Sequence, residues 1–509
     1  MNSESRTYNS ARNLTMSIIN KVVHILLTFI GRQIFLRVLA IDYLGINGLF
    51  ANVLSMLSLA DLGLAVAMSY SFYKPLAEKD EDKLAALIGF YKKIYNYIAA
   101  FVGVAGLILT PFLKYIINLD NEIKYIEVYY LISLANVVTS YLFVYKATII
   151  TADQHNSIIK KYSMWTTVAG MALQIVVLLT LKSYLVYCLV TMLGILTNNL
   201  LISGKADKMY PFIKKKAQLS AADREDIFVN IRSIFVHKLA SVIYTSTDNI
   251  LISIIVGTAV VGKYENYCLA TVNLASIASI IFGTLSPSIG NLIAKEAPEK
   301  RMRVFNVMQM VSFWTGGFFV FCLFFLLDNF VTLWLGAGFS FDMLTKAAIF
   351  INFYLAITLN PVISFREATG IYKKTKYVMV SGAVLNIVLS VIMGKYIGLA
   401  GILLATCISK LLTYIWYEPR VLFRDYLGGS IARYFLNHFI NIILLAACIA
   451  LTYYFIPQSL SWNPGWLGWI LKGFVCAIGI NIVYILRYFR TPEFREIKVK
   501  AKSLLKRGR

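Results

Sequence analysis

Residues 14–40 of this chain read LTMSIINKVVHILLTFIGRQIFLRVLA, and this run decides how the rest of the sequence is interpreted. It is long enough to cross the roughly 30 Å hydrocarbon core of a bilayer as a single helix. It is also too long for the apolar part of a signal peptide, and it lacks an A-x-A-like cleavage site. We therefore expect residues 14–40 to form the first membrane span.

Composition extends this interpretation to the whole chain. Of its 509 residues, 58% are hydrophobic and 15% are charged, and the mean hydropathy is +0.68. These values are typical of membrane proteins rather than soluble domains. About fourteen apolar segments of roughly 20 residues follow one another, separated by short polar turns. They lie at residues 14–40, 46–73, 84–112, 123–148, 159–181, 183–203, 229–257, 262–290, 304–327, 343–367, 375–394, 398–418, 431–456 and 466–487.

The excess of basic residues fits this arrangement. The chain has 49 Lys and Arg against 26 Asp and Glu, a formal net charge of +23. An even number of spans places both termini on one side of the membrane. If that side is the cytoplasm, most of the basic residues fall there, as the positive-inside rule predicts. Topology therefore explains the charge without nucleic acid as a partner.

Nothing in the sequence is typical of an enzyme or a cofactor-binding protein. The longest hydrophilic segment, residues 204–228, is too short for a catalytic domain. The chain contains no G-x-x-x-x-G-K-[ST], H-E-x-x-H or G-x-S-x-G motif. Its six cysteines lie far apart in apolar stretches. We expect no enzymatic activity, no cofactor and no metal site.

The two halves of the chain resemble each other at an offset of 217 residues. The matches in register include Lys21 with Lys238, Thr28 with Thr245, and Gly45 with Gly262. Because six spans separate the copies, both run in the same direction, which predicts a pseudo-two-fold axis along the membrane normal. We expect two six-helix bundles around a central cavity in an all-α membrane protein. The expected parts are an N-terminal bundle (1–203), a basic cytoplasmic connector (204–228), a C-terminal bundle (229–421), two extra spans (422–490) and a basic tail (491–509).

Polar side chains form a stripe on the first span and another on the seventh. Steps of 3, 4, 7 and 11 residues return to one helix face. The first stripe consists of Ser17, Lys21, His24, Thr28 and Arg32, and the second of Lys238, Ser241, Thr245, Asp248 and Asn249. An unpaired cation near the bilayer centre costs at least about 2.5 kcal/mol. We therefore expect both stripes to face a water-filled, cationic cavity.

Other roles for these residues stay open. Arg32 could extend its charge to the membrane surface, and Lys238 could pair with Asp248 or with Asp61 of the second span. Asp61 is a candidate counter-ion, coupling-cation ligand or helix-packing residue. His24 is a candidate proton relay or a hydrogen-bonded interior histidine.

The second half adds two prolines and an arginine. Pro287 and Pro361 remove backbone hydrogen bonds and should bend their spans. Arg366 follows Pro361 and is expected at the cytoplasmic mouth of the cavity, with or without contact to the substrate.

Three motifs carry a resemblance to a known family. The segments YLGINGLF (43–50), SLADLGL (58–64) and YKPL (73–76) resemble the opening of bacterial polysaccharide-transporter proteins. These are oligosaccharide flippases of the multidrug/oligosaccharidyl-lipid/polysaccharide exporter (MOP) superfamily. The resemblance implies export of undecaprenyl-pyrophosphate-linked oligosaccharide units across a bacterial cytoplasmic membrane by alternating access. It also implies a polysaccharide polymerase and glycosyltransferases as possible partners.

Under this hypothesis the cavity residues divide into two roles. The candidates for substrate binding are Lys21, His24, Thr28, Arg32, Lys238, Thr245, Asn249 and Arg366, and the candidates for a counter-ion or coupling role are Asp61 and Asp248. The alternatives are a lipid II flippase, a multidrug or cation antiporter of the same fold, and a multispanning polymerase or ligase. The antiporter should have acidic rather than basic residues in its cavity, and the enzyme should have outer catalytic clusters.

Overall fold

A computed structural model provides the fold of this chain. It describes residues 6–58, 64, 68, 71–72, 75–76, 78–119, 123–153, 155–215, 217–220, 224–225, 227, 239, 242–244, 246–283, 289, 292–293, 296–455 and 465–507. The described chain is almost entirely helical and divides into two compact units, residues 1–262 and 263–509. Lys238, Thr245, Asp61, Ser241 and Pro287 lie outside the described residues.

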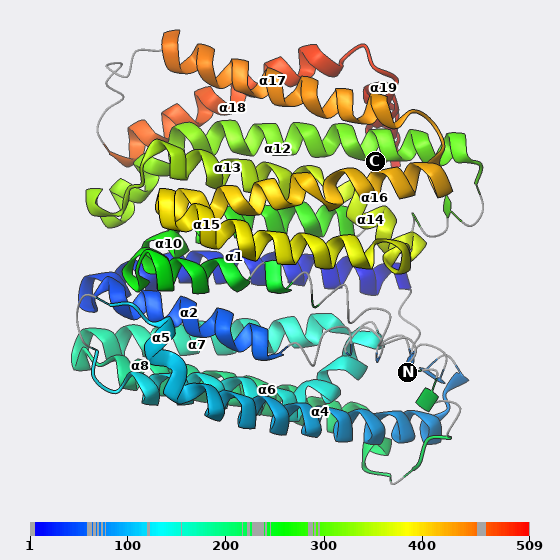
Figure 1. The fold of residues 1–509 in the computed structure, drawn as a ribbon. Coiled ribbons are helices and arrows are strands. Elements are labelled where there is room, and N and C mark those ends of the chain that lie inside the picture. Colours follow the sequence, from blue (N-terminus) through cyan, green and yellow to red (C-terminus); the bar gives the residue numbers. More distant parts are fainter. Residues whose placement is uncertain are drawn as a thin grey trace. The chain divides into compact units, whose positions relative to one another are not determined.

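Unit 1 is a bundle of long apolar helices, which run side by side in Figure 1. Its helices are α1 (Arg6–Val38), α2 (Ile41–Leu57), α4 (Glu81–Leu109), α5 (Leu113–Ile116), α6 (Ile126–Ala152), α7 (Asn156–Leu181) and α8 (Tyr184–Met209), with the short helices η2 (Thr110–Phe112) and η3 (Pro211–Lys214). Helix α1 packs along α7, α7 along α8, α8 along α6, and α6 along α4. A shorter apolar helix, Val242–Ile255, belongs to the same unit.

Unit 2 is organised around the long helix α12 (Pro298–Leu335), which contacts α13, α14, α17, α18 and α19. Its other elements are α10 (Thr258–Gly283, beginning in unit 1), η4 (Ala337–Phe339), α13 (Met343–Thr358), α14 (Asn360–Thr369), α15 (Tyr372–Leu412), α16 (Tyr414–Leu422), η5 (Phe423–Leu427), α17 (Ile431–Phe455), α18 (Trp466–Tyr488) and α19 (Pro492–Arg507). A stack of Trp314, Tyr484, Tyr488 and Phe494 joins α12, α18 and α19.

The described helices agree with the expected spans. Nine of them are long and apolar enough to cross a membrane, or ten when α13 and α14 are taken as one broken span. The bend between α13 and α14 is 40° and lies beside Pro361, which confirms the expected effect of that proline. The four other predicted spans correspond to α2, Val242–Ile255, α10 and the second arm of α15.

Helix α15 is a hairpin of two helices rather than one long rod. Gly398 has φ 62° and ψ −138°, which interrupts the helix. The Asn386 side-chain amide donates to the Thr406 hydroxyl at 2.9 Å, although these residues would lie about 30 Å apart along a straight helix. The chain therefore reverses at Gly398, and the predicted segments 375–394 and 398–418 are antiparallel neighbours.

Candidate substrate-binding residues

The polar stripe of α1 lies opposite the most exposed apolar face of that helix. Ile19, Val22, Leu26 and Ile30 are exposed and share one side of α1. At 100° per residue, Lys21, Thr28 and Arg32 point about 180° away from them, and all three are half-buried. The polar residues of α1 therefore lie on the side turned away from the exposed apolar face.

Contacts within the stripe are few near its start and aromatic near its end. Lys21 lies beside His24 and makes no hydrogen bond or ion pair with a described residue. The Thr28 hydroxyl donates to the His24 carbonyl at 2.7 Å, and the exposed His24 ring lies 3.4 Å from it through Nδ1. Arg32 lies near Tyr187, whose ring contacts Phe35 and stacks on Tyr184. The stripe thus joins cations to an aromatic wall.

The second stripe is described only in part. Asp248 is half-buried, Asn249 is buried, and both have polar or electrostatic partners. Their helix is fixed at its end because the Ser253 hydroxyl donates to the Ile116 carbonyl at 2.8 Å. Thr258 and Asn118 bond each other reciprocally, at 2.7 and 3.0 Å. The pairing of the two stripes around one cavity stays a prediction, because Lys238 and Thr245 are outside the described residues.

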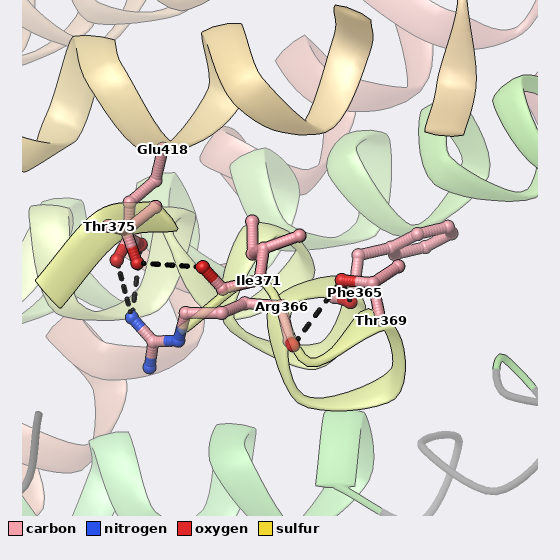
Figure 2. A network of polar contacts seen from close by, with 6 residues as sticks. All are labelled: Phe365, Arg366, Thr369, Ile371, Thr375 and Glu418. Carbon is pink, nitrogen blue, oxygen red and sulfur yellow. Dashed lines mark hydrogen bonds and ion pairs between the residues drawn. The ribbon is translucent and has the colours of Figure 1, made fainter. Parts of the chain in front are cut away.

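Arg366 forms a buried ion pair with Glu418, a partner that the sequence did not reveal. Its Nη1 lies 3.0 Å from each carboxylate oxygen of Glu418. Figure 2 shows the Glu418 side chain of α16 pointing at the guanidinium of α14. Arg366 is 8% exposed and Glu418 is 2% exposed, so this pair joins the two helices inside unit 2. An acidic residue beside Pro419 in an apolar segment was the available signal. Substrate contact by Arg366 stays a prediction.

A third group of polar residues lies between α6, α7 and α8. The Thr166 hydroxyl donates to the Asn198 side-chain oxygen at 3.2 Å, and the Gln174 amide donates to the Thr191 hydroxyl at 2.9 Å. A cavity of about 450 Å³ between α6 and α8 is lined by Ser140, Asn198 and Asn199, among mostly apolar neighbours. Such hydroxyl and amide groups can bond sugar hydroxyls. The adjacent asparagines 198–199 in an apolar span were the sequence signal.

Repeat-related glycines make a reciprocal contact within unit 1. A methyl group added to Gly45 would overlap the backbone carbonyl of Thr258, and one added to Gly262 would lie 2.7 Å from the backbone carbonyl of Ile41. Thr258 is 217 residues after Ile41, as Gly262 is after Gly45. A residue that contacts the counterpart of its own partner in this way is characteristic of a two-fold relationship. The offset found in the sequence therefore relates two short segments that touch each other.

Comparison with solved structures places this architecture. A structure of the lipid II flippase MurJ in an inward closed conformation matches with a TM-score of 0.64 and 14% identity, over 94% of this chain and 99% of that chain. The chain has the fold of a MOP-superfamily transporter. This confirms the predicted fold class of an all-α, multi-pass membrane protein.

Multidrug transporters with the MOP fold match over less of this chain. The MATE transporter DinF-BH in complex with R6G has a TM-score of 0.58 and 15% identity, over 83% of this chain and 96% of that chain. An inward-facing MATE family transporter of the MOP superfamily has a TM-score of 0.57 and 14% identity, over 79% of this chain and 98% of that chain. No protein-family model and no curated protein sequence matches the chain.

Proposed function

We propose that this protein is a flippase that exports undecaprenyl-pyrophosphate-linked oligosaccharide units across a bacterial cytoplasmic membrane. The observation that carries the proposal is the match to MurJ over nearly the full length of both chains. The MATE structures leave roughly a fifth of this chain uncovered while being almost fully covered themselves. The extra length therefore favours a flippase over a drug antiporter.

The charge of α1 supports an anionic substrate. This helix contains Lys21, Arg32 and Arg37 and no acidic residue. Lys21 and Arg32 lie opposite the exposed apolar face. Ammonium and guanidinium groups form charge-assisted hydrogen bonds with phosphate oxygens. A cation substrate would instead need carboxylates on this face.

The proposed mechanism follows from the chemistry of the lipid. Lys21, Arg32 and, in the second repeat, Lys238 hold the pyrophosphate, while hydroxyl and amide side chains bond the sugars. The polyprenyl tail stays in the bilayer because it is apolar, and rocking of the bundles exposes the head group to the opposite side. An inside-negative potential favours this outward movement by about 2.3 kcal/mol per negative charge per 100 mV. Both termini lie in the cytoplasm, and a polymerase and glycosyltransferases act before and after transport.

Lipid II export is the second candidate, and the MurJ match favours it. Both substrates share the polyprenyl pyrophosphate, so the two candidates differ only in the sugar portion. Leaflet-inversion assays with each defined lipid separate them.

The decisive experiment measures inversion of a lipid-linked oligosaccharide in proteoliposomes. We expect Lys21→Gln to lower the rate at least tenfold and Lys21→Arg to restore most of it, since one charge-assisted contact contributes about 1.5–3 kcal/mol. Lys395→Gln, which alters an exposed lysine at the α15 turn, is the matched control and should leave the rate unchanged. Normal transport by a correctly inserted Lys21→Gln variant would remove the pyrophosphate role of this residue. Failure of the wild type on every lipid-linked sugar would refute the flippase proposal itself.

A further inference from the structure

A second polar cavity lies entirely within unit 2, at the ends of four helices. It has a volume of about 570 Å³ and is bounded by α12, α17, α18 and α19. Helices α17 and α18 are antiparallel apolar spans, so the beginning of α17 and the end of α18 reach the same membrane surface. The Tyr488 hydroxyl of α18 donates to the Asn441 side-chain oxygen of α17 at 2.8 Å, which fixes this pairing. The cavity therefore lies at the depth of lipid head groups.

Two arginines in the cavity wall have no acidic partner. Arg433 lies in the first turn of α17 and Arg487 in the last turn of α18. Neither guanidinium forms an ion pair with a residue in the described part of the chain. Arg487 lies against the ring of Tyr488, 5.5 Å from its centroid. Glu493 is the carboxylate in the lining, so the wall keeps a net charge of +1.

The backbone adds further donors at the start of α17. Gly428 and Gly429 both have positive φ and turn the chain into the helix, and Gly429 and Ser430 line the cavity. The first amides of a helix have no partner within the helix, and the helix dipole places partial positive charge there. Helix starts of this kind bind phosphate groups.

Buried polar atoms in the same wall lack partners. The Gln309 side chain is 5% exposed, and its Oε1 has no hydrogen bond among the described residues, although its Nε2 donates to the Thr358 carbonyl at 3.1 Å. The Tyr434 hydroxyl and the Arg487 Nε are likewise buried without a partner in the described chain. Polar atoms in protein interiors are normally satisfied, so these three indicate a missing polar ligand.

We propose that this cavity binds the phosphate of an anionic phospholipid from the surrounding leaflet. Arg433, Arg487 and the first amides of α17 hold the phosphate, whose single negative charge matches the net charge of the wall. Gln309 and Tyr434 accept and donate hydrogen bonds to the glycerol-type part of the head group. Leu436 and Leu486, which are exposed beside the two arginines, contact the acyl chains. The proposal does not depend on what the protein transports.

The test is lipid binding to the purified full-length protein, measured by native mass spectrometry with phosphatidylglycerol and phosphatidylcholine. We expect preference for phosphatidylglycerol and an approximately tenfold loss of its affinity in Arg433→Gln and in Arg487→Gln, the scale of one lost charge-assisted contact. Glu493→Gln should increase the affinity because it removes the negative charge from the wall. Since one variant must gain affinity, a general folding defect cannot produce this pattern.

Arg490→Gln is the matched control, because Arg490 is exposed near the same surface but does not line the cavity. It should leave phosphatidylglycerol binding unchanged. Equal losses in Arg490→Gln and Arg433→Gln would mean that general surface charge attracts the lipid, and the site would be rejected. Unchanged affinity in both cavity variants would reject it as well. Displacement of the lipid by an equal concentration of inorganic phosphate would show a site for free phosphate and overturn the assignment to a phospholipid.

Discussion

Removing the charge of Glu418 should destabilise unit 2 strongly. The Glu418→Gln variant keeps the shape of the side chain but leaves the Arg366 guanidinium without its counter-charge. Arg366 is 8% exposed, so water cannot replace the lost partner. At 3.0 Å and an effective dielectric constant of about 20, the gross attraction in the pair is about 5–6 kcal/mol. Relief of carboxylate desolvation offsets part of this loss, and we expect a net loss of about 3–5 kcal/mol in the free energy of unfolding.

The double variant Arg366→Met with Glu418→Leu separates a packing role from a substrate role. Replacing both charges by apolar groups of similar volume should recover most of the stability. The assay is the unfolding midpoint in detergent, with transport measured on the same preparations. Lys300→Gln, which breaks an exposed pair with Glu296, is the control and should cost less than about 1 kcal/mol.

Two outcomes of this cycle are decisive. A loss below about 1 kcal/mol in Glu418→Gln would refute the claim that the pair stabilises the contact between α14 and α16. A stable double variant that no longer transports would assign Arg366 a substrate contact, whereas a stable and active one would exclude that contact.

Three further predictions concern backbone geometry. Gly45→Ala and Gly262→Ala should each lower the unfolding midpoint, because the new methyl group meets backbone atoms, whereas Gly170→Ala has open space and should be neutral or stabilising. Gly398→Ala should cost about 1–3 kcal/mol in unfolding free energy, since φ 62° with ψ −138° suits only glycine, and equal stability of the variant and wild type would contradict the hairpin. Asp342→Ala should cost about 1 kcal/mol in the same measurement, because the carboxylate caps α13 by accepting from the Thr345 amide. These bonds lower the pKa of Asp342, so its contribution is present above the usual carboxyl pKa of 3.8 and is lost as the pH falls through the lower folded value; wild type and Asp342→Ala should converge there.

The spans could be predicted because the physical requirement is local. A bilayer requires long apolar runs with satisfied backbone hydrogen bonds, and both properties are visible in a window of about 20 residues. The break beside Pro361 was predictable for the same reason. The start of α19 was harder, because its contact between Phe494 and Trp314 joins residues that are far apart in the chain.

The face of α1 was predictable, but the partners of its residues were not. Periodicity alone placed Lys21, Thr28 and Arg32 on one side, and the exposure of Leu26 and Ile30 agrees with that side being turned from the lipid. The ion pair of Arg366 with Glu418 spans 52 residues and depends on how α14 meets α16. No local pattern contains that information. The cavity at the start of α17 depends on four helices and was missed for the same reason.

The reciprocal contact of Gly45 and Gly262 has a consequence for how a duplicated chain diverges. At this crossing the main chains themselves meet, so the fit depends on peptide groups that every sequence shares and on the absence of two side chains. Mutations elsewhere can accumulate independently in either copy without changing the distance between these backbones. The two copies can therefore become nearly unrecognisable as relatives while the crossing that sets their geometry persists.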